Sequence, residues 1–356
     1  MLIKLKSYIL PVGAALIVAG CGTTLATQNV TKEELNTEAM KQREFSLMER
    51  YEIEEQVRDT SFQVLKGAVS LCDETDYNLG IAYWSVHNYA KEWQAAAKNQ
   101  YHVSDAVTLK YVYKNSPAAK AGLKVGDQIL KVNNNELPIG KQSVEKLSEF
   151  IEKAKDKTTP ISIVYARDNQ VSSTKVTPVK TCGYNIQYDD SAVVNAYADG
   201  KNITIVRGMV EFTRTDDELA MVIGHELAHN VLSHIDKKTA QMTAGMLGGL
   251  LLDVLIGTGG DFSNMGAEMG ANAYSPEYES EADYMGLYAS ALAGYDIVKA
   301  PYLWRRMGAR NTGSITMTST HPPTAARFVA LEKTVAEIQY KLANNKPLVP
   351  EKKANK

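Results

Sequence analysis

The residues with the clearest chemical potential form the pentapeptide His225-Glu226-Leu227-Ala228-His229. Two histidines four residues apart lie on one face of a helix, so both imidazoles can bind the same metal ion. Zinc is the metal that suits this spacing best. Glu226 follows the first histidine, where it can act as a general base on an attacking water molecule without being a ligand. The pentapeptide therefore predicts a zinc peptidase with one Zn²⁺ per chain.

The sequence around the pentapeptide predicts a buried helix. Thr215-Asp216-Asp217-Glu218 has the form of a capping box, with acidic side chains at the positive end of the helix dipole. His225 lies within the apolar run from Ala220 to Leu227, where an unpaired polar side chain would be costly. The expected burial of His225 therefore argues against the alternative, which is a helix that carries two surface histidines beside a glutamate and binds no metal.

A catalytic zinc also needs a third protein ligand and an open fourth position. The best candidates lie after Ser275-Pro276, which predicts the start of a helix. Glu279 and Asp283 would share one face of that helix, so one carboxylate can bind the metal and the other can accept the free N–H of a ligand histidine. Glu281 points elsewhere and is the weaker ligand candidate. His234 is off the ligand face of the first helix and is not expected to be a ligand.

These two motifs together resemble the membrane-associated zinc metallopeptidases of the CaaX-prenyl-protease type, and more closely their periplasmic lipoprotein relatives in bacteria. The resemblance covers about residues 182–343 and includes residues 194–200 and 319–327. It implies a mainly helical zincin domain of the gluzincin type with a small sheet. The ligands that it implies are His225, His229 and Glu279.

The same resemblance draws attention to a late histidine and arginine. His321 would approach the metal, either to stabilise an oxyanion or to occupy the fourth zinc position in a latent state. Arg327 follows on the next helix, where it could pair with Asp283 or with a substrate carbonyl. A purely structural role stays open for both residues.

The amino terminus predicts export. Lys4 and Lys6 precede an apolar stretch that ends at Cys21, which makes residues 1–20 a short signal peptide rather than a spanning helix. The residues before Cys21 resemble a bacterial lipobox, so cleavage there would leave a lipidated cysteine and a tether at residues 21–31. Simple cleavage and secretion is the alternative. Because Gly22 is not aspartate, resemblance to lipoprotein sorting favours the outer membrane, facing the periplasm.

Lipidation of Cys21 would leave two further cysteines, Cys72 and Cys182. An even remainder in an exported chain predicts one disulfide bond between them.

Composition sets broader limits. A length of 356 residues predicts about two domains, and a net charge of −2 gives no sign of nucleic-acid binding. No later stretch has the roughly 18 uncharged apolar residues of a membrane span. Residues 245–274 are rich in glycine and methionine, which predicts a helix and a mobile loop beside the cleft, or simple packing.

A second domain is expected at residues 77–180, where short β-type runs alternate with one helix near 142–154. Residues 116–129 resemble the PDZ domains of HtrA-type periplasmic proteases. The resemblance implies that Leu79-Gly80-Ile81 binds a peptide C-terminus, because backbone N–H groups in such a loop can hold a carboxylate. The domain could instead only space or cover the active site. Cys72 and Cys182 would bracket it.

We therefore expect an α+β chain in which a β-rich PDZ domain is inserted into a helical peptidase. Its remaining parts are a helical segment at residues 32–76, a metallopeptidase core at 181–343 and a polar tail at 344–356. The expected function is a membrane-anchored zinc endopeptidase of the bacterial envelope, which cleaves unfolded or misassembled proteins paired with the strand near 203–206. A PDZ-based binding protein or chaperone with latent proteolysis is the alternative, and the presence of Glu226 favours the enzyme.

Overall fold

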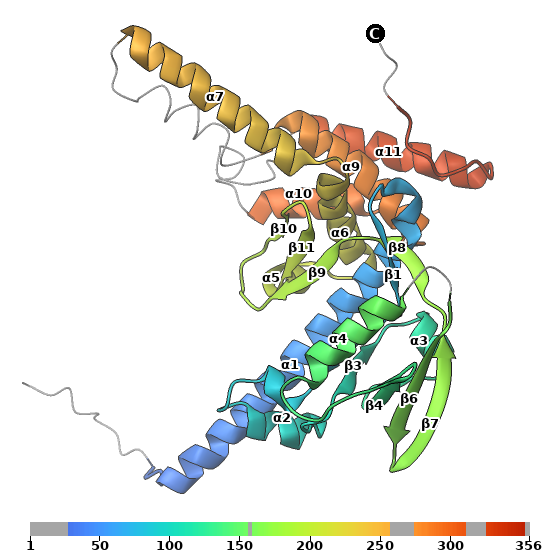
Figure 1. The fold of residues 1–356 in the computed structure, drawn as a ribbon. Helices are drawn as coiled ribbons and strands as arrows, with labels where there is room; N and C mark the ends of the chain where they lie inside the picture. The colour runs from blue at the N-terminus through green and yellow to red at the C-terminus, as the bar shows by residue number, and fades with distance from the viewer. Residues whose placement is uncertain (1–27, 156–158, 257–273, 311–324, 353–356) are drawn as a thin grey trace, which may run out of the picture.

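The computed structural model describes residues 28–155, 159–256, 274–310 and 325–352 (Figure 1). The predicted signal peptide, Cys21 and His321 lie outside these residues. Within them, no helix combines the length and the apolar character that crossing a bilayer requires. The chain is a mixed α+β protein, as expected, with a largely helical part and a β-rich part. They are called the peptidase part and the PDZ part below, after the domains that the sequence predicts there.

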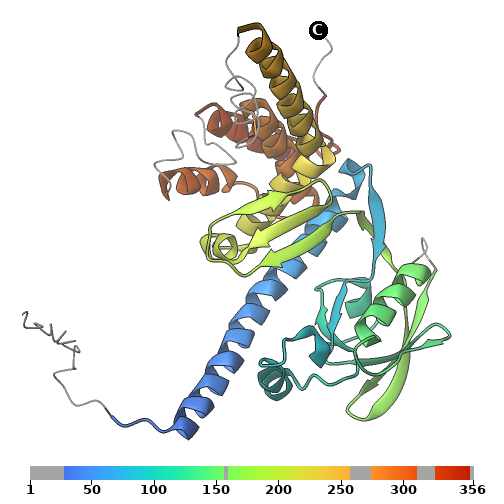
Figure 2. The same ribbon diagram turned by 60° about the vertical axis from the view of Figure 1, so that its left-hand side comes forward.

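A single long helix, α1 (Lys32–Gly67), runs along both parts of the chain (Figures 1 and 2). It begins at a complete capping box, in which Thr31 and Glu34 each bond the other's backbone N–H. Its last turns pack into the peptidase core through Val57, Val64 and Leu65. Its middle contacts the PDZ part, where Glu54 pairs with Lys110 at 2.6 Å.

The PDZ part is built on a six-stranded sheet in the order β2-β3-β4-β6-β7, with β5 paired to β4. The elements of this part are β2 (Ile81–Trp84), α2 (Gln94–Tyr101), β3 (Thr108–Val112), α3 (Pro117–Lys120), β4 (Gln128–Val132), β5 (Asn135–Glu136), α4 (Ser143–Ala154), β6 (Ile161–Arg167) and β7 (Gln170–Val176). Short 3-10 helices lie at Ala68–Leu71 and Val86–Asn88. Helix α4 covers the sheet with Leu147 and Ile151, which belong to a core separate from that of the peptidase.

A narrow neck joins the two parts. Strand β1 (Thr75–Asn78) leaves the peptidase and pairs antiparallel with β8 (Val179–Cys182), which returns to it. Cys72 and Cys182 form a disulfide bond at this neck, with their Cα atoms 5.6 Å apart, so the predicted pairing is confirmed.

The peptidase part has a small three-stranded sheet in the order β10-β11-β9. Strand β11 (Asn202–Val206) lies in the centre, between β10 (Ala196–Ala198) and β9 (Asn185–Asp189). The expectation that a substrate pairs with residues 203–206 is therefore wrong, because both edges of that segment already carry partners. In the described sheet, β10 and β9 are the edge strands.

Six helices complete the peptidase part of the described chain. They are α5 (Arg207–Phe212), α6 (Asp216–Val231), α7 (His234–Ile256), α9 (Pro276–Leu292), α10 (Ala300–Arg310) and α11 (Ala325–Ala343). The helix predicted within residues 245–274 is present as the end of α7, and the rest of that segment up to residue 273 lies outside the described residues. Helix α6 lies at the centre and contacts α1, α9 and the small sheet.

Candidate metal centre

Helix α6 carries the pentapeptide and is buried along most of its length. The Thr215 hydroxyl accepts from the Glu218 backbone N–H, which fixes the first turn. The capping box is only half formed, because Glu218 accepts from the Arg214 N–H and from Arg306. The Arg306 hydrogen bonds lower the pKa of Glu218 against the opposing effect of burial. The start of α6 is thereby tied to α10.

Helix α9 supplies the carboxylates. It starts as the sequence predicts, with the Ser275 hydroxyl accepting from the Tyr278 N–H and Pro276 at its first position. Helices α6 and α9 cross where Gly224 faces Gly286, and a Cβ on Gly286 would lie 2.7 Å from the His225 backbone nitrogen. Only glycines allow so close an approach, which brings both helices' functional side chains together.

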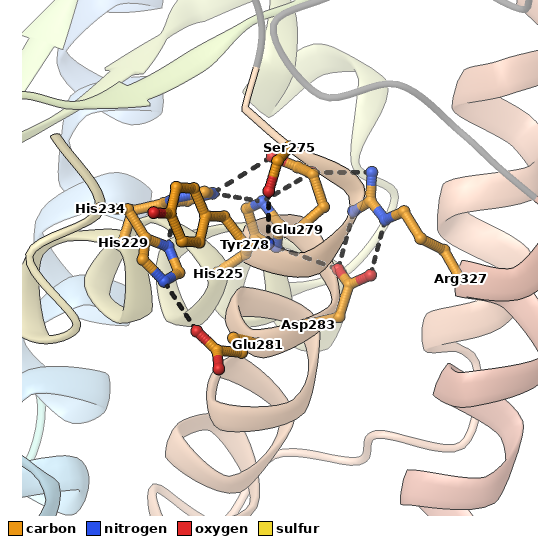
Figure 3. Close-up of polar contacts among 9 residues, drawn as sticks. All are labelled: His225, His229, His234, Ser275, Tyr278, Glu279, Glu281, Asp283 and Arg327. Atoms are coloured by element: carbon orange, nitrogen blue, oxygen red, sulfur yellow. Dashed lines mark hydrogen bonds and ion pairs between the residues drawn. The ribbon is translucent and has the colours of Figure 1, made fainter. Parts of the chain in front are cut away.

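His225, His229 and Glu279 converge at this crossing (Figure 3). The two histidine Nε2 atoms lie 3.1 Å apart, and each lies 3.5–3.6 Å from a Glu279 carboxylate oxygen. All three side chains are fully buried. Ligand atoms about 2.0–2.2 Å from a tetrahedral zinc ion lie roughly 3.3–3.6 Å from one another, so the spacing and the donor set both fit that metal.

His225 is held in orientation by a buried ion network. Its Nδ1 lies 3.0 Å from Asp283 Oδ1, and Arg327 donates to the two Asp283 oxygens at 2.7 and 2.8 Å. Arg327 also contacts Glu279 at 2.8 Å. Between the alternatives for Arg327, the structure therefore has the ion pair with Asp283, and it links the metal ligand Glu279 to the same network (Figure 3).

Charge keeps this network ionised despite its burial. Burial alone would raise the pKa of Asp283, but the charge and hydrogen bonds of Arg327 and His225 outweigh it, so the pKa lies below its usual range. Burial likewise opposes the charge of Arg327, yet Asp283 and Glu279 raise its pKa. Asp283 is thus a carboxylate that can accept the His225 N–H.

Two residues near His229 make contacts that the sequence did not predict. His234 is fully buried, and its Nδ1 lies 3.0 Å from the Nδ1 of His229. Its Nε2 lies 3.3 Å from Glu281 Oε2. Helical spacing continued from α6 would place His234 away from His229, which is why the sequence did not predict this contact. The chain instead bends at Ser233, whose φ is 52°, and α7 begins at His234.

Tyr274 is the other residue. Its ring stacks on His229 with ring centroids 4.0 Å apart. Burial and the nearby charges of Glu226 and Glu279 raise its pKa, so its hydroxyl stays protonated beside the predicted base. Glu226 itself is buried. The only sequence signal for Tyr274 was its position just before the helix start at Ser275-Pro276.

The predicted peptide-binding loop, residues 79–81, lies far from the metal-site residues in the sequence, at the start of the PDZ sheet. Leu79 packs in the PDZ core, and Ile81 opens the edge strand β2. Gly80 has a φ of +74°, and its N–H donates to Asn78 Oδ1 at 2.7 Å. Peptide binding by this loop stays a prediction.

Comparison with known proteins agrees with the site. Residues 166–335 match the model for peptidase family M48, and residues 108–164 match the model for the PDZ domain. The mitochondrial metalloendopeptidase OMA1 of Schizosaccharomyces pombe is 30% identical over 40% of this chain and 43% of its own length. Residues 166–335 are therefore similar to the metallopeptidases of family M48, and the residues that could hold the metal in this part are His225, His229 and Glu279. Residues 108–164 are similar to PDZ domains.

Two bacterial proteins are also similar. The beta-barrel assembly-enhancing protease of Yersinia pestis is 27% identical over 32% of this chain and 26% of its own length. A putative beta-barrel assembly-enhancing protease of Vibrio cholerae is 24% identical over 51% of this chain and 37% of its own length. The chain thus spans less than half of each of these curated relatives.

Proposed function

We propose that this chain is a zinc-dependent endopeptidase of the bacterial cell envelope, which cleaves unfolded or misassembled envelope proteins. The observation that carries the proposal is the buried convergence of His225, His229 and Glu279 with Glu226 beside them. A site with two histidines, one carboxylate and an adjacent unligated glutamate is the arrangement of hydrolytic zinc enzymes.

The geometry suggests a role for each residue of the site. His225, His229 and Glu279 would hold the metal ion, which would supply Lewis acidity to water and to the scissile carbonyl. Glu226 takes the proton from the attacking water and passes it to the leaving amine. Asp283 and Arg327 keep the His225 ring oriented. Burial and the charges of Glu226 and Glu279 raise the pKa of Tyr274, so its hydroxyl stays protonated at neutral pH.

The shape of the small sheet supports extended substrates. Strand β10 packs against α6 and is an edge of the described sheet, so its outer backbone groups can pair with an added strand. Ala196 and Ala198 face the protein, whereas Tyr197 is 43% exposed. A polypeptide must be locally unfolded to pair in this way, which favours unfolded or misassembled proteins as substrates.

The envelope location is supported by independent features. The amino-terminal sequence has the pattern of a lipoprotein signal ending at Cys21. The Cys72–Cys182 disulfide suits an oxidising compartment. Two relatives bear the name beta-barrel assembly-enhancing protease. We therefore place the chain on the outer membrane through a lipid on Cys21, with its domains in the periplasm and its PDZ loop binding peptide C-termini.

The test is cleavage of an unfolded protein such as reduced casein by purified protein, with zinc content measured in parallel. Glu226→Gln should keep full zinc content and lose cleavage by roughly 10²- to 10⁴-fold, because the base is removed and the ligands remain. Turnover like that of the wild type in this variant would overturn the mechanism. If wild-type protein binds zinc and unfolded protein but cleaves nothing, the alternative of a PDZ-based binder or chaperone replaces the enzyme.

A further inference from the structure

The two metal-ligand histidines are supported differently. His225 contacts a carboxylate directly, through Asp283 at 3.0 Å. His229 instead contacts a third histidine, His234, which in turn contacts Glu281. His234 is fully buried, belongs to the first turn of α7, and is used by no step of the mechanism above.

The proton positions along this chain of contacts follow from the metal site. A neutral histidine that binds a metal through Nε2 carries its proton on Nδ1. His229 turns its Nε2 towards His225 and Glu279, and its Nδ1 lies 3.0 Å from the Nδ1 of His234. With a metal bound at Nε2, the Nδ1–H of His229 would therefore donate to His234. His234 must then carry its own proton on Nε2, which lies 3.3 Å from the Glu281 carboxylate. Along the path from His229 through His234 to Glu281, each donor would then face an acceptor.

We propose that His234 and Glu281 are a positioning pair, which holds His229 in the ring orientation and tautomer that bind the metal. This inference rests on the proposed function, since it concerns the same metal site. It gives Glu281 a role through His234 and not as a ligand, although Glu281 lies only two residues from Glu279 along the chain.

Stacked aromatic rings fix the same pair from the side. Tyr278 stacks on His234 with ring centroids 4.6 Å apart, and Tyr274 stacks on His229 at 4.0 Å. The hydroxyl of Tyr278 accepts from Gln241 on α7 at 2.9 Å, which ties the two helices together. With flat rings on these faces, neither imidazole can rotate freely, so the hydrogen-bonded path keeps its direction.

The bend between α6 and α7 is what makes the pair possible. Ser233 adopts a left-handed conformation, and α7 then turns so that His234 lies between His229 and α9. Helix α9 thus serves the metal site on two sides, with Glu279 and Asp283 towards His225 and with Tyr278 and Glu281 towards His234 (Figure 3). Loss of a hydrogen-bonded partner behind a metal ligand typically weakens metal binding by about 10- to 100-fold.

The experiment measures zinc affinity by competition with a chromogenic chelator, together with the visible absorption spectrum of the cobalt(II)-loaded protein. Every variant is made in the Glu226→Gln background, so neither readout depends on peptidase activity. His234→Ala should weaken zinc binding by about 10- to 100-fold and change the cobalt spectrum. His234→Gln, which can still accept from His229, should recover most of the affinity.

Glu281 provides the second pair of variants, because its side chain is 42% exposed and substitution there is compatible with folding. Glu281→Ala should weaken zinc binding by several-fold, whereas Glu281→Gln, which keeps an acceptor oxygen, should stay near the parent protein. His87→Ala is the control, since this histidine pairs with Asp105 in the PDZ part.

Zinc affinities within about twofold of the parent for both alanine variants, with unchanged cobalt spectra, would overturn the positioning pair. A uniform loss in His234→Ala and His234→Gln, with Glu281→Ala unchanged, would also overturn it, because packing alone would then explain the effect. Wild-type protein with Glu226 intact that binds zinc but cleaves no unfolded protein would instead refute the proposed function and leave the positioning pair standing.

Discussion

Neighbouring carboxylates on α9 differ sharply in their surroundings at the residue scale. Glu279 is fully buried and lies within 3.5–3.6 Å of both ligand histidines, whereas the Glu281 side chain is 42% exposed and contacts His234. Asp283 is buried between His225 and Arg327. About one turn of α9 therefore provides the candidate ligand Glu279, the His234 partner Glu281, and Asp283, which orients His225.

This difference predicts distinct effects on metal content. Glu279→Ala should leave the purified protein largely without zinc, because one of three protein ligands is gone. Glu281→Ala should keep one zinc per chain at saturating metal, with only a reduced affinity. Elemental analysis of both proteins after the same dialysis is the measurement. The reverse order of zinc contents would move the third ligand to Glu281.

Close packing governs the site at the scale of elements. Gly224 and Gly286 let α6 and α9 approach closely, and a Cβ on Gly286 would meet His225 and Gly224 backbone atoms at 2.7–2.9 Å. The distance between the two helices therefore sets the distance between the histidines and Glu279.

Gly286→Ala should push these helices apart. We expect zinc affinity to fall by at least tenfold, because tetrahedral sites tolerate little displacement of their ligands. Overpacking should lower the free energy of unfolding by about 1–3 kcal/mol, partly offset by the better helix propensity of alanine. Unfolding of the metal-free protein separates this cost from the effect at the site. Unchanged affinity together with unchanged stability would show that the crossing can relax.

The start of α6 depends on an ion pair between elements. Arg306 on α10 donates to both Glu218 oxygens at 2.7 and 2.9 Å, and also to the Phe212 carbonyl at 3.0 Å. Both side chains of the pair are largely buried. Arg306→Met should lower the free energy of unfolding at pH 7 by about 2–3 kcal/mol.

This effect should depend on pH in a defined direction. The folded-state pKa of Glu218 is lowered, so the stabilisation is complete above its unfolded pKa of about 4.3 and is lost as the pH falls through the folded value. The difference between wild type and Arg306→Met should therefore be constant near neutral pH and shrink in acid. Denaturant unfolding at pH 7 and in acid measures it. Arg305→Met is the control, because Arg305 and Glu332 are about half exposed and should contribute little. A difference that grows in acid would contradict the assignment.

At the scale of the whole molecule, α1 and the neck hold the PDZ part against the peptidase (Figure 2). Along α1, Glu54 pairs with Lys110 and Asp59 pairs with Lys114. At the neck, β1 pairs with β8, and the disulfide closes a segment of 110 residues.

Removing the disulfide should lower the stability of the folded chain. The double variant Cys72→Ser, Cys182→Ser should lose about 2–4 kcal/mol of stability, since the unfolded chain regains the freedom that a loop of this length had lost. Denaturant unfolding with and without reductant measures the loss. Reduced wild-type protein should have the same free energy of unfolding as the double variant. If oxidised wild-type protein were no more stable than the variant, the expectation would be wrong.

The sequence by itself determined the local chemistry. The shared face of His225 and His229, the place of Glu226 beside the first histidine and the shared face of Glu279 and Asp283 follow from helical periodicity, which acts over one turn. The helix starts at Thr215 and Ser275 were likewise predictable, because capping depends on residues within three positions. The disulfide followed from the parity of the cysteines in an exported chain.

Only the tertiary structure decided which distant groups meet. The place of β11 between two partners depends on strand order, which no short sequence window contains. Arg327 contacts both Asp283 and Glu279 because α11 packs against α9. His234 reaches His229 because Ser233 adopts a left-handed backbone conformation between α6 and α7. Helical periodicity alone would continue α6 through this residue. Long-range packing sets these contacts, because their energy depends on how whole elements cross and not on the spacing of neighbouring residues.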